Sequence, residues 1–562
     1  KKVMEKKMSN TLIVNLKRFG DIFSSGHLVN SLKKDDPSKK VSIIIFEEFE
    51  AGTKALNLFD NIYTINREEI LTLKGNDLFP DSMAINLFTR FIDLLQGKDF
   101  KEIINYSNDE ISTNIVSFLN FNKNSNVVGI HYDRKKNVLF NSDWSIIFND
   151  VLTTFPISPI HFIDCYHKMC GLSSLNTSKV LASNKKYDDI AKNNFQQIIK
   201  IKFKDLKDIK IIGIQLKTSN PEKDIPKKII IKLIDRLKKH GKILPVILIS
   251  SSPNEKEYAN EINEVFKNSL ISIESDFLAL PSVMNNLDLL ITPDTSVKHI
   301  ADLNKTPVLE IINGSAPFLK QGTFNKDNCI LTNKSNLTPK IKKFESLCPS
   351  SEDIYYSALF QIGLIQKEQI KLSPKILFFK VEKDSLGTRY DITNKELDNE
   401  TQKSLLSLYI SRYYIQSITE SNSPNINIKN FSHFKIDLIN EWAKEEKDQA
   451  FKAIKDLLET LKALISIQKN INNGKDFANS LDKIFNYCSS NFLISIPTLI
   501  FRAKIENLVD NSFDNNMKSV EGLLYEFKRN IQTLVNKIDD FNNLVNKIPN
   551  RKKPNIQKPV FL

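Results

Sequence analysis

The chain has 562 residues, which is too long for one ordinary hydrophobic core and predicts two or three domains. Its composition, 41% hydrophobic and 26% charged, is that of a soluble globular protein. The net charge of +13 comes from 79 basic and 66 acidic residues that are interspersed along the chain. We therefore interpret the charge as a solvated, lysine-rich surface. A nucleic-acid interface would show basic residues interleaved with aromatic ones along a stripe, and the sequence has no such stripe.

The sequence gives little indication of a targeting segment, a membrane span or disulfide bonds. The opening KKVMEKKMSN lacks the apolar core of a signal peptide, and the longest apolar runs, such as ILPVILI at 243–249, are far too short to span a membrane. We expect a cytoplasmic protein, and leave open peripheral contact with the inner membrane. Five cysteines argue against a disulfide framework. Cys165 and Cys170 would point about 140° apart on a helix, so we interpret them as core thiols.

Strand-like and helix-like segments alternate over the first 130 residues. The apolar runs are continuous and not alternating, which is typical of parallel strands covered on both faces. The expected strands are 11–16, 41–46, 61–65, 102–107 and 127–130, and the expected helices include 21–34, 51–58 and 82–95. Residues 131–207 have the character of a connecting region with helices.

The alternation restarts in a second block. Its expected strands are 209–216, 245–250, 270–273, 289–292 and 307–312. Two such blocks predict an α/β protein with two doubly wound, Rossmann-like domains that face a cleft. We place the first domain at 11–205, after a flexible N-terminus at 1–10, and the second at 206–368.

The character of the chain changes after the second block. We expect a mainly helical extension at 369–548, in which 375–382 and 388–393 could pair as a hairpin, and a basic tail at 549–562. The amphipathic stretch 448–469 could be core or an oligomer face, and we favour core. Contact between the tail and a membrane surface is a hypothesis only.

The segment LLITPDTSVKHIADLNKTPVLEI, residues 289–311, combines a strand, a turn and a helix. We expect Asp294 to cap the helix, with Thr295 and Ser296 offering hydroxyl and N–H groups in its first turn. Unpaired N–H groups and the helix macrodipole favour negative charge, so this helix start is a candidate diphosphate site, with His299 one turn further on. A plain helix cap is the competing interpretation.

A second candidate is Asp21, in the sequence LKRFGD at residues 16–21. This single carboxylate stands just past the first expected strand and at the start of a helix. Ligands of doubly wound sheets bind beyond the carboxyl ends of the strands, so Asp21 is well placed for chemistry. An ordinary helix cap is again the alternative.

The order of the motifs carries a family resemblance. A strand followed by RFGD at 18–21, a Lys-x-x-Pro turn at 223–226, D-T-x-x-x-H at 294–299 and a TPV strand at 306–308 resembles the ADP-heptose-dependent heptosyltransferases. These enzymes form glycosyltransferase family nine and have the two-domain GT-B fold. The resemblance covers roughly residues 10–365.

The resemblance implies roles in the first domain, which would bind the acceptor. Asp21 matches the catalytic carboxylate, the general base on the acceptor hydroxyl. Gly20 precedes it in the same motif. Lys17 and Arg18 would steer a phosphorylated acceptor toward Asp21, or are simply solvated. We give these two interpretations equal weight.

In the second domain the resemblance implies a donor site. Lys223 matches the lysine that contacts the nucleotide phosphates, although Ile225 stands where a tryptophan is usual, and a surface lysine is the alternative. Glu255 matches the acidic residue that holds the ribose, or is an exposed first-turn glutamate.

The diphosphate turn of the family reads D-T-G-x-x-H. Asp294, Thr295 and His299 match it, whereas Ser296 replaces the glycine. A serine keeps the N–H but adds a side chain where the backbone should approach the ligand closely. This departure bears on the identity of the donor and on activity itself.

The sequence therefore predicts an inverting glycosyltransferase that uses a nucleotide-activated sugar, ADP-heptose first. Because no D-x-D pair and no Walker A, G-x-G-x-x-G or H-E-x-x-H motif is present, we expect no metal and no further cofactor. The acceptor would be a lipopolysaccharide-type glycan or a protein. The alternative is an inactive GT-B scaffold that acts through the helical extension, which could bind a protein partner or form an oligomer.

Overall fold

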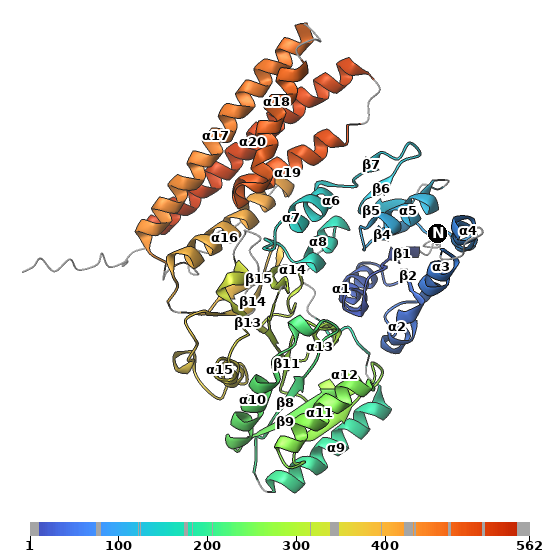
Figure 1. Cartoon of the computed structure of the whole chain (residues 1–562), viewed down its shortest axis with the longest axis vertical. Coiled ribbons are helices and arrows are strands. Elements are labelled where there is room, and N and C mark those ends of the chain that lie inside the picture. Colours follow the sequence, from blue (N-terminus) through green and yellow to red (C-terminus); the bar gives the residue numbers. More distant parts are fainter. Residues whose placement is uncertain are drawn as a thin grey trace, which may run out of the picture. The chain divides into compact units, whose positions relative to one another are not determined.

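The computed structural model of the chain divides into two compact units, residues 1–393 and 394–562 (Figure 1). It describes residues 10–74, 80–121, 123, 125–172, 178–182, 184–204, 206–314, 316–337, 348–394, 396–420, 431, 434–469, 474–508 and 512–547. Residues 1–9 of the predicted flexible N-terminus and the predicted basic tail lie outside the described residues.

The first unit begins with a five-stranded parallel sheet in the order β3-β2-β1-β4-β5. Its strands are β1 (Asn10–Val14), β2 (Lys40–Phe46), β3 (Asn61–Ile65), β4 (Glu102–Asn105) and β5 (Asn126–Val128). The continuous apolar runs of these strands are buried, as their pattern predicts, because helices cover the sheet.

The helices of this domain follow the strands. They are α1 (Phe19–Asp35), α2 (Glu50–Leu56), α3 (Arg67–Lys74), α4 (Pro80–Gln96), α5 (Glu110–Asn120), α6 (Asp143–Ile146), α7 (Leu152–Thr154) and α8 (Phe162–Met169). A π-helical turn, Ile147–Val151, separates α6 from α7. A small hairpin of β6 (His131–Tyr132) and β7 (Val138–Leu139) precedes α6.

The second domain contains an eight-stranded sheet in the order β10-β9-β8-β11-β12-β13-β14-β15. Its parallel strands are β8 (Lys210–Gln215), β9 (Ile243–Ile249), β10 (Ile271–Glu274), β11 (Leu289–Thr292), β12 (Val308–Ile311) and β13 (Cys329–Asn333). Its helices are α9 (Lys185–Phe203), α10 (Lys227–Lys239), α11 (Pro253–Val265), α12 (Leu280–Met284), α13 (Ser296–Asn304), α14 (Phe318–Gln321) and α15 (Ser351–Gln361). Each sheet is doubly wound, which confirms the predicted fold class.

The predicted boundary at residue 368 is wrong. The hairpin of β14 (Ile376–Asp384) and β15 (Gly387–Ile392) forms as expected, but β14 pairs antiparallel with β13 and so extends the second sheet. Its apolar residues, among them Phe378 and Phe379, are buried there. An edge strand with this many apolar groups is stable only when it is paired and covered, and this requirement assigns the hairpin to the first unit.

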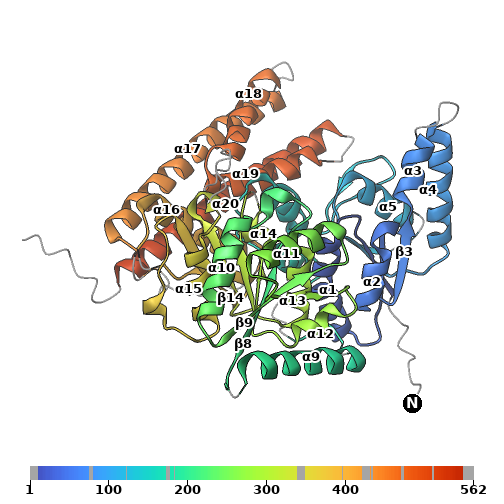
Figure 2. The ribbon, with the colours of Figure 1, turned by 60° about the horizontal axis from the view of Figure 1, so that its bottom comes forward.

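The predicted boundary at residue 205 also differs from the structure. Helix α9, which we assigned to the first domain, packs against α12 of the second (Figures 1 and 2). Just before it, the N–H of Val180 donates to the carbonyl of Leu303, so the crossing to the second domain precedes α9.

The second unit is helical, as predicted. It contains α16 (Asn399–Thr419), α17 (Ile436–Lys469), α18 (Gly474–Phe485), α19 (Phe492–Glu506) and α20 (Phe513–Asn546). The predicted loop at 421–432 lies outside the described residues except for Phe431, and of the loop at 470–475 only residues 474 and 475 are described.

Helix α17 divides its apolar residues between two faces. Leu457 and Leu464 are buried in the core of the unit, as favoured from the sequence. Phe451, Leu458 and Ile465 are instead 55%, 44% and 50% exposed and recur every seventh residue. The stretch is therefore core on one side only.

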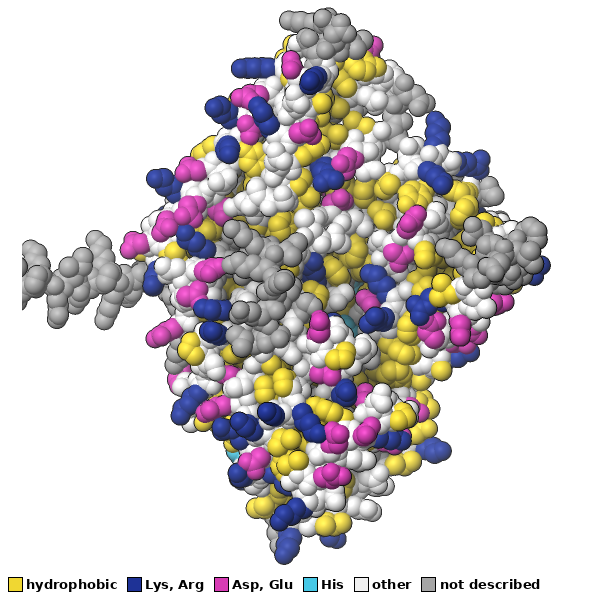
Figure 3. Space-filling model, in the orientation of Figure 1, with side chains coloured by type: hydrophobic (Ala, Val, Ile, Leu, Met, Phe, Trp, Pro, Cys, Tyr) yellow, Lys and Arg dark blue, Asp and Glu magenta, His cyan; other side chains and the backbone are white. Residues whose placement is uncertain are grey.

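Charges of both signs are mixed over the surface that Figure 3 shows, without a large basic patch. This agrees with the interpretation of the net charge as a solvated surface. No helix of the described residues is long and apolar enough to cross a membrane.

Candidate functional site

Asp21 lies in the first turn of α1, directly beyond the carboxyl end of β1. The N-cap of this helix is Arg18, so Asp21 is not the cap residue that the alternative reading required. Burial raises the pKa of the Asp21 carboxyl, and the carboxylate of Asp294 adds to the rise, whereas the Lys17 ammonium and the N–H groups of Arg18 and Asp21 oppose it. A carboxylate with a raised pKa is a suitable general base.

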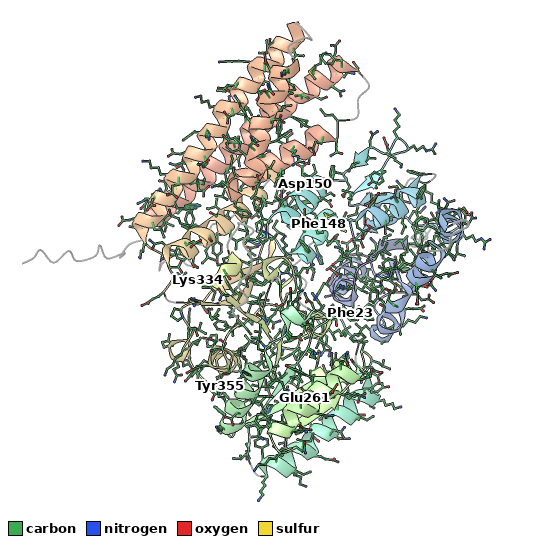
Figure 4. All side chains as sticks on the ribbon, in the orientation of Figure 1. Phe23, Phe148, Asp150, Glu261, Lys334 and Tyr355 are labelled. Atoms are coloured by element: carbon green, nitrogen blue, oxygen red, sulfur yellow. The ribbon has the colours of Figure 1, made fainter. Side chains whose placement is uncertain are left out.

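Asp21 lines a small pocket that is partly open to solvent. The pocket is lined by Lys17, Asp21, Ser24, Tyr106, Phe148, His161, Phe162, Ile163, Tyr166, His299 and Gln321. Most of these residues come from the first domain, including Phe148, which Figure 4 labels. His299 and Gln321 come from the second domain, so the two domains form the pocket together.

His299 lies on α13 and is 9% exposed. Burial lowers the pKa of its imidazole well below the usual range, and the neighbouring Lys298 ammonium lowers it further. The ring packs closely against Gly20, where an added Cβ would stand 3.2 Å from His299 Cδ2. The predicted acceptor motif and the predicted donor motif therefore meet at this contact.

Asp294 does not cap α13, contrary to the sequence expectation. The N-cap is Thr295, whose side chain makes no capping hydrogen bond. The Asp294 carboxylate instead accepts hydrogen bonds from Lys223 Nζ and Lys298 Nζ, each at 2.7 Å. Two ammonium groups outweigh the opposing effect of burial and hold the pKa of Asp294 well below its usual range.

Lys223 ends the short 3₁₀ turn Pro221–Lys223 and reaches Asp294 from there. The structure thus brings together two predicted donor residues that are far apart in the chain. Thr295 and Ser296 complete the start of α13, and since no side chain caps it, its first N–H groups are available to an anion.

Glu255 is not among the residues that line the pocket. It lies in the first turn of α11, and its Oε2 accepts the N–H of Ser250 at 2.7 Å. This contact stabilises the turn between β9 and α11. A role in holding a ribose stays a prediction.

Lys17 and Arg18 differ in position. Lys17 lines the pocket beside Asp21, whereas Arg18 is exposed and reaches Ser219 Oγ of the second domain at 3.5 Å. Lys17 is therefore the better placed of the two to meet a ligand.

Sequence reasoning missed the aromatic wall of the pocket. Tyr106 and Tyr166 stack with their ring centroids 3.9 Å apart, and Tyr166 Oη donates to the carbonyl of Tyr106. Tyr106 Oη also hydrogen-bonds Ser24 Oγ on α1, at 3.1 Å. Tyr106 follows β4, at the end of the expected strand 102–107, and Tyr166 lies in α8, in the region interpreted only as a connection. No motif marks either residue.

His161 was missed as well. Its Nδ1 accepts the N–H of Ile163, so Nε2 carries the proton and donates to the carbonyl of Gly322 at 2.9 Å. Burial lowers the pKa of His161 to about 4, and the ring is therefore neutral at physiological pH. This hydrogen bond joins the first domain to Gly322, which follows Gln321 at the end of α14.

Among the residues that the structure describes, no three His, Cys, Asp or Glu side chains are grouped so that they could hold a metal ion. Cys165 and Cys170 are free, and burial raises the pKa of both thiols. Cys165 is a core thiol, as predicted, whereas Cys170 is only partly buried.

Two doubly wound domains that share one pocket at the carboxyl ends of their strands define the GT-B architecture. Residues 95–349 match the model of glycosyltransferase family 9 (heptosyltransferase). This match confirms the resemblance and identifies the chain as a glycosyltransferase. No curated protein sequence matches the chain.

The chain is also similar to solved structures over part of its length. One is a family 9 glycosyl transferase from Veillonella parvula, with 14% identity, a TM-score of 0.43 and coverage of 63% of this chain and 97% of the other. The heptosyltransferase WaaC of E. coli with ADP has 15% identity, a TM-score of 0.43 and coverage of 63% and 99%. The E. coli ADP-heptose lps heptosyltransferase II has 12% identity, a TM-score of 0.41 and coverage of 63% and 98%.

Proposed function

We propose that the chain transfers a heptose from ADP-heptose to a hydroxyl of a lipopolysaccharide-type glycan, with inversion at the anomeric carbon and without a metal ion. A protein acceptor is the second choice within the same chemistry. The observation that carries the proposal is the position of the Asp21 carboxylate, with its raised pKa, in a pocket that also contains His299.

In the proposed reaction Asp21 takes the proton of the acceptor hydroxyl as its oxygen attacks the anomeric carbon. The bond from that carbon to the diphosphate breaks on the opposite face, and the nucleoside diphosphate leaves with the electron pair. The first N–H groups of α13 would stabilise the leaving negative charge, because they have no capping side chain.

Lys223 supports the same assignment. It lies at 2.7 Å from Asp294, just before α13, so its ammonium is within reach of a phosphate bound there. Ser296, the first residue of α13, keeps the backbone N–H that the family glycine would offer. The serine side chain therefore leaves less room for the ligand, but the N–H that can donate a hydrogen bond to it is kept.

The test is a transfer assay with ADP-heptose and a heptose-deficient lipopolysaccharide core. Asp21→Asn is expected to lower turnover by about 10²-fold to 10⁴-fold, the usual contribution of a general base, while ADP binding stays near the wild-type value. Glu110→Gln is the control, because Glu110 also lies in the first turn of the helix that follows its strand, here β4, and is exposed.

The rival is a scaffold that retains the fold without catalysis. It predicts that the wild type transfers no sugar to any acceptor and that Asp21→Asn changes nothing. Equal turnover in wild type and Asp21→Asn would also exclude Asp21 as the base.

A further inference from the structure

Lys298 is a completely buried lysine of α13, the helix whose start is the proposed diphosphate site. Its side chain is 0% exposed, and all of its hydrogen-bonding capacity is used. Nζ donates to Asp294 Oδ1 at 2.7 Å, to Glu310 Oε1 at 3.0 Å and to the carbonyl of Gln321 at 2.6 Å. One ammonium group thus connects Asp294 in the turn before α13, Glu310 in strand β12 and Gln321 at the end of α14.

The residues that follow Gln321 are held by further hydrogen bonds. Glu310 Oε2 accepts the N–H of Thr323 at 2.6 Å, while Oε1 is bound to Lys298. His161 of the first domain donates to the carbonyl of Gly322, between these two contacts. The position of Gln321 in the pocket therefore depends on Lys298 and Glu310.

The network contains two ammonium groups, those of Lys223 and Lys298, and two carboxylates, those of Asp294 and Glu310. Asp294 is shared between the two ammonium groups. Glu310 accepts a hydrogen bond from Lys298 with Oε1 and the N–H of Thr323 with Oε2. The four side chains are thus balanced in charge, and Lys298 joins the two carboxylates.

Removing one partner of a buried ion pair is costly, because it leaves an uncompensated charge in the interior. Lys298 contacts Asp294, which also binds Lys223, and the carbonyl of Gln321, which lines the pocket. It therefore fixes two groups of the proposed site at once.

We propose that Lys298 is a positioning residue of the donor site, which recognises the diphosphate group of a nucleoside diphosphate: its ammonium holds Asp294 and the turn at Gln321 in place. This inference rests on the proposed function, because it assumes that the donor diphosphate binds at the start of α13.

The test is a set of four proteins: wild type, Lys298→Met, Glu310→Gln and the double variant. Binding of ADP and of inorganic pyrophosphate is measured by calorimetry, and stability by thermal unfolding. Lys298→Met is expected to lose both stability and affinity, because it leaves the Glu310 carboxyl without its cation. The double variant removes both charges and keeps an acceptor for the Thr323 N–H.

We expect the double variant to regain most of the lost stability but to bind pyrophosphate about tenfold more weakly than the wild type, since Asp294 and Gln321 lose the ammonium that holds them in place. Glu310→Gln alone, which retains Lys298, is expected to bind pyrophosphate at least as tightly as the wild type above pH 7. This single variant gives a result even if the double variant fails to fold.

Wild-type affinity in the double variant would overturn the inference and leave the proposed function intact. So would weaker binding by Glu310→Gln in a protein of unchanged stability. If the wild type binds neither ADP nor pyrophosphate, the proposed donor site itself is wrong, and the inference falls with it.

Discussion

Gly20 of α1 and His299 of α13 pack against each other across the two domains of the first unit. A Cβ at residue 20 would stand 3.2 Å from His299 Cδ2, which is closer than ordinary van der Waals contact, and 3.5 Å from Nε2. Asp21 follows Gly20 directly, so the close approach sets the distance between the proposed base and the donor helix. The glycine of the RFGD motif is explained by this contact and not by an unusual backbone angle.

Replacing Gly20 should therefore affect turnover more than stability. Gly20→Ala must displace His299 by a few tenths of an ångström, and we expect turnover to fall about tenfold because reacting groups are sensitive to small misplacements. The thermal midpoint should shift by less than about 4 °C. Gly97→Ala, where a Cβ meets only open space and one carbonyl 3.9 Å away, is the control, and equal activity of the two variants would contradict the prediction.

The raised pKa of Asp21 predicts the pH dependence of the reaction. A general base must be deprotonated, so kcat/KM should rise with pH through the pKa of Asp21, at a pH above the usual range for an aspartate. Because the Lys17 ammonium lowers this pKa, Lys17→Met should move the inflection to higher pH. Lys33→Met, at the far end of α1, should leave it in place. A shift to lower pH in Lys17→Met would disprove the electrostatic assignment.

Glu310 should make the stability of the wild type depend on pH near neutrality. Its pKa is raised from 4.5 to about 7 in the folded state, so between these values the folded protein holds a proton that the unfolded chain releases. Its contribution to the unfolding free energy is therefore complete below about pH 4.5 and is lost as the pH rises through 7.

Glu310→Gln removes this loss. The difference in unfolding free energy between Glu310→Gln and wild type should grow in favour of the variant by about 1 kcal/mol or more from pH 5 to pH 8, measured by urea unfolding. Glu110→Gln serves as the reference variant. A difference that stays constant over this range would show that Glu310 does not titrate there.

The assignment of the β14–β15 hairpin can be tested by truncation. A chain that ends at Thr393 retains the hairpin on β13 and is expected to unfold cooperatively, since it corresponds to one compact unit. A chain that ends at Glu368 leaves the β13 edge unpaired and removes buried Phe378, so it should aggregate. Good solubility and cooperative unfolding of the shorter fragment would support the original boundary at residue 368.

The sequence predicted the sheets well, because buried parallel strands leave continuous apolar runs such as VSIIIF at 41–46. It also predicted that Asp21 and Asp294 each follow a strand, and the structure places them after β1 of the first sheet and β11 of the second. Ligands of doubly wound sheets bind beyond the carboxyl ends of the strands. The pairing of Lys223 with Asp294 agrees with that expectation.

The aromatic wall and His161 could not be predicted in this way. Their contacts join residues that are distant in sequence, as Tyr106 after β4 and Tyr166 in α8 are. The Lys298–Glu310 pair did leave a signal. Glu310 interrupts the apolar strand PVLEII, and a charged residue inside a buried strand requires a partner of opposite charge nearby.

The central claim is that the start of α13 binds the diphosphate of a nucleotide sugar. Its most direct test is the thermal midpoint of the wild type, Lys223→Ala and Asp294→Ala, each titrated with ADP, UDP, GDP and ADP-heptose. We predict that ADP and ADP-heptose raise the wild-type midpoint in a concentration-dependent way, that UDP and GDP do not, and that both variants lose the effect. An unchanged midpoint with every nucleotide, in a wild-type protein that is folded, would contradict the claim and favour the scaffold.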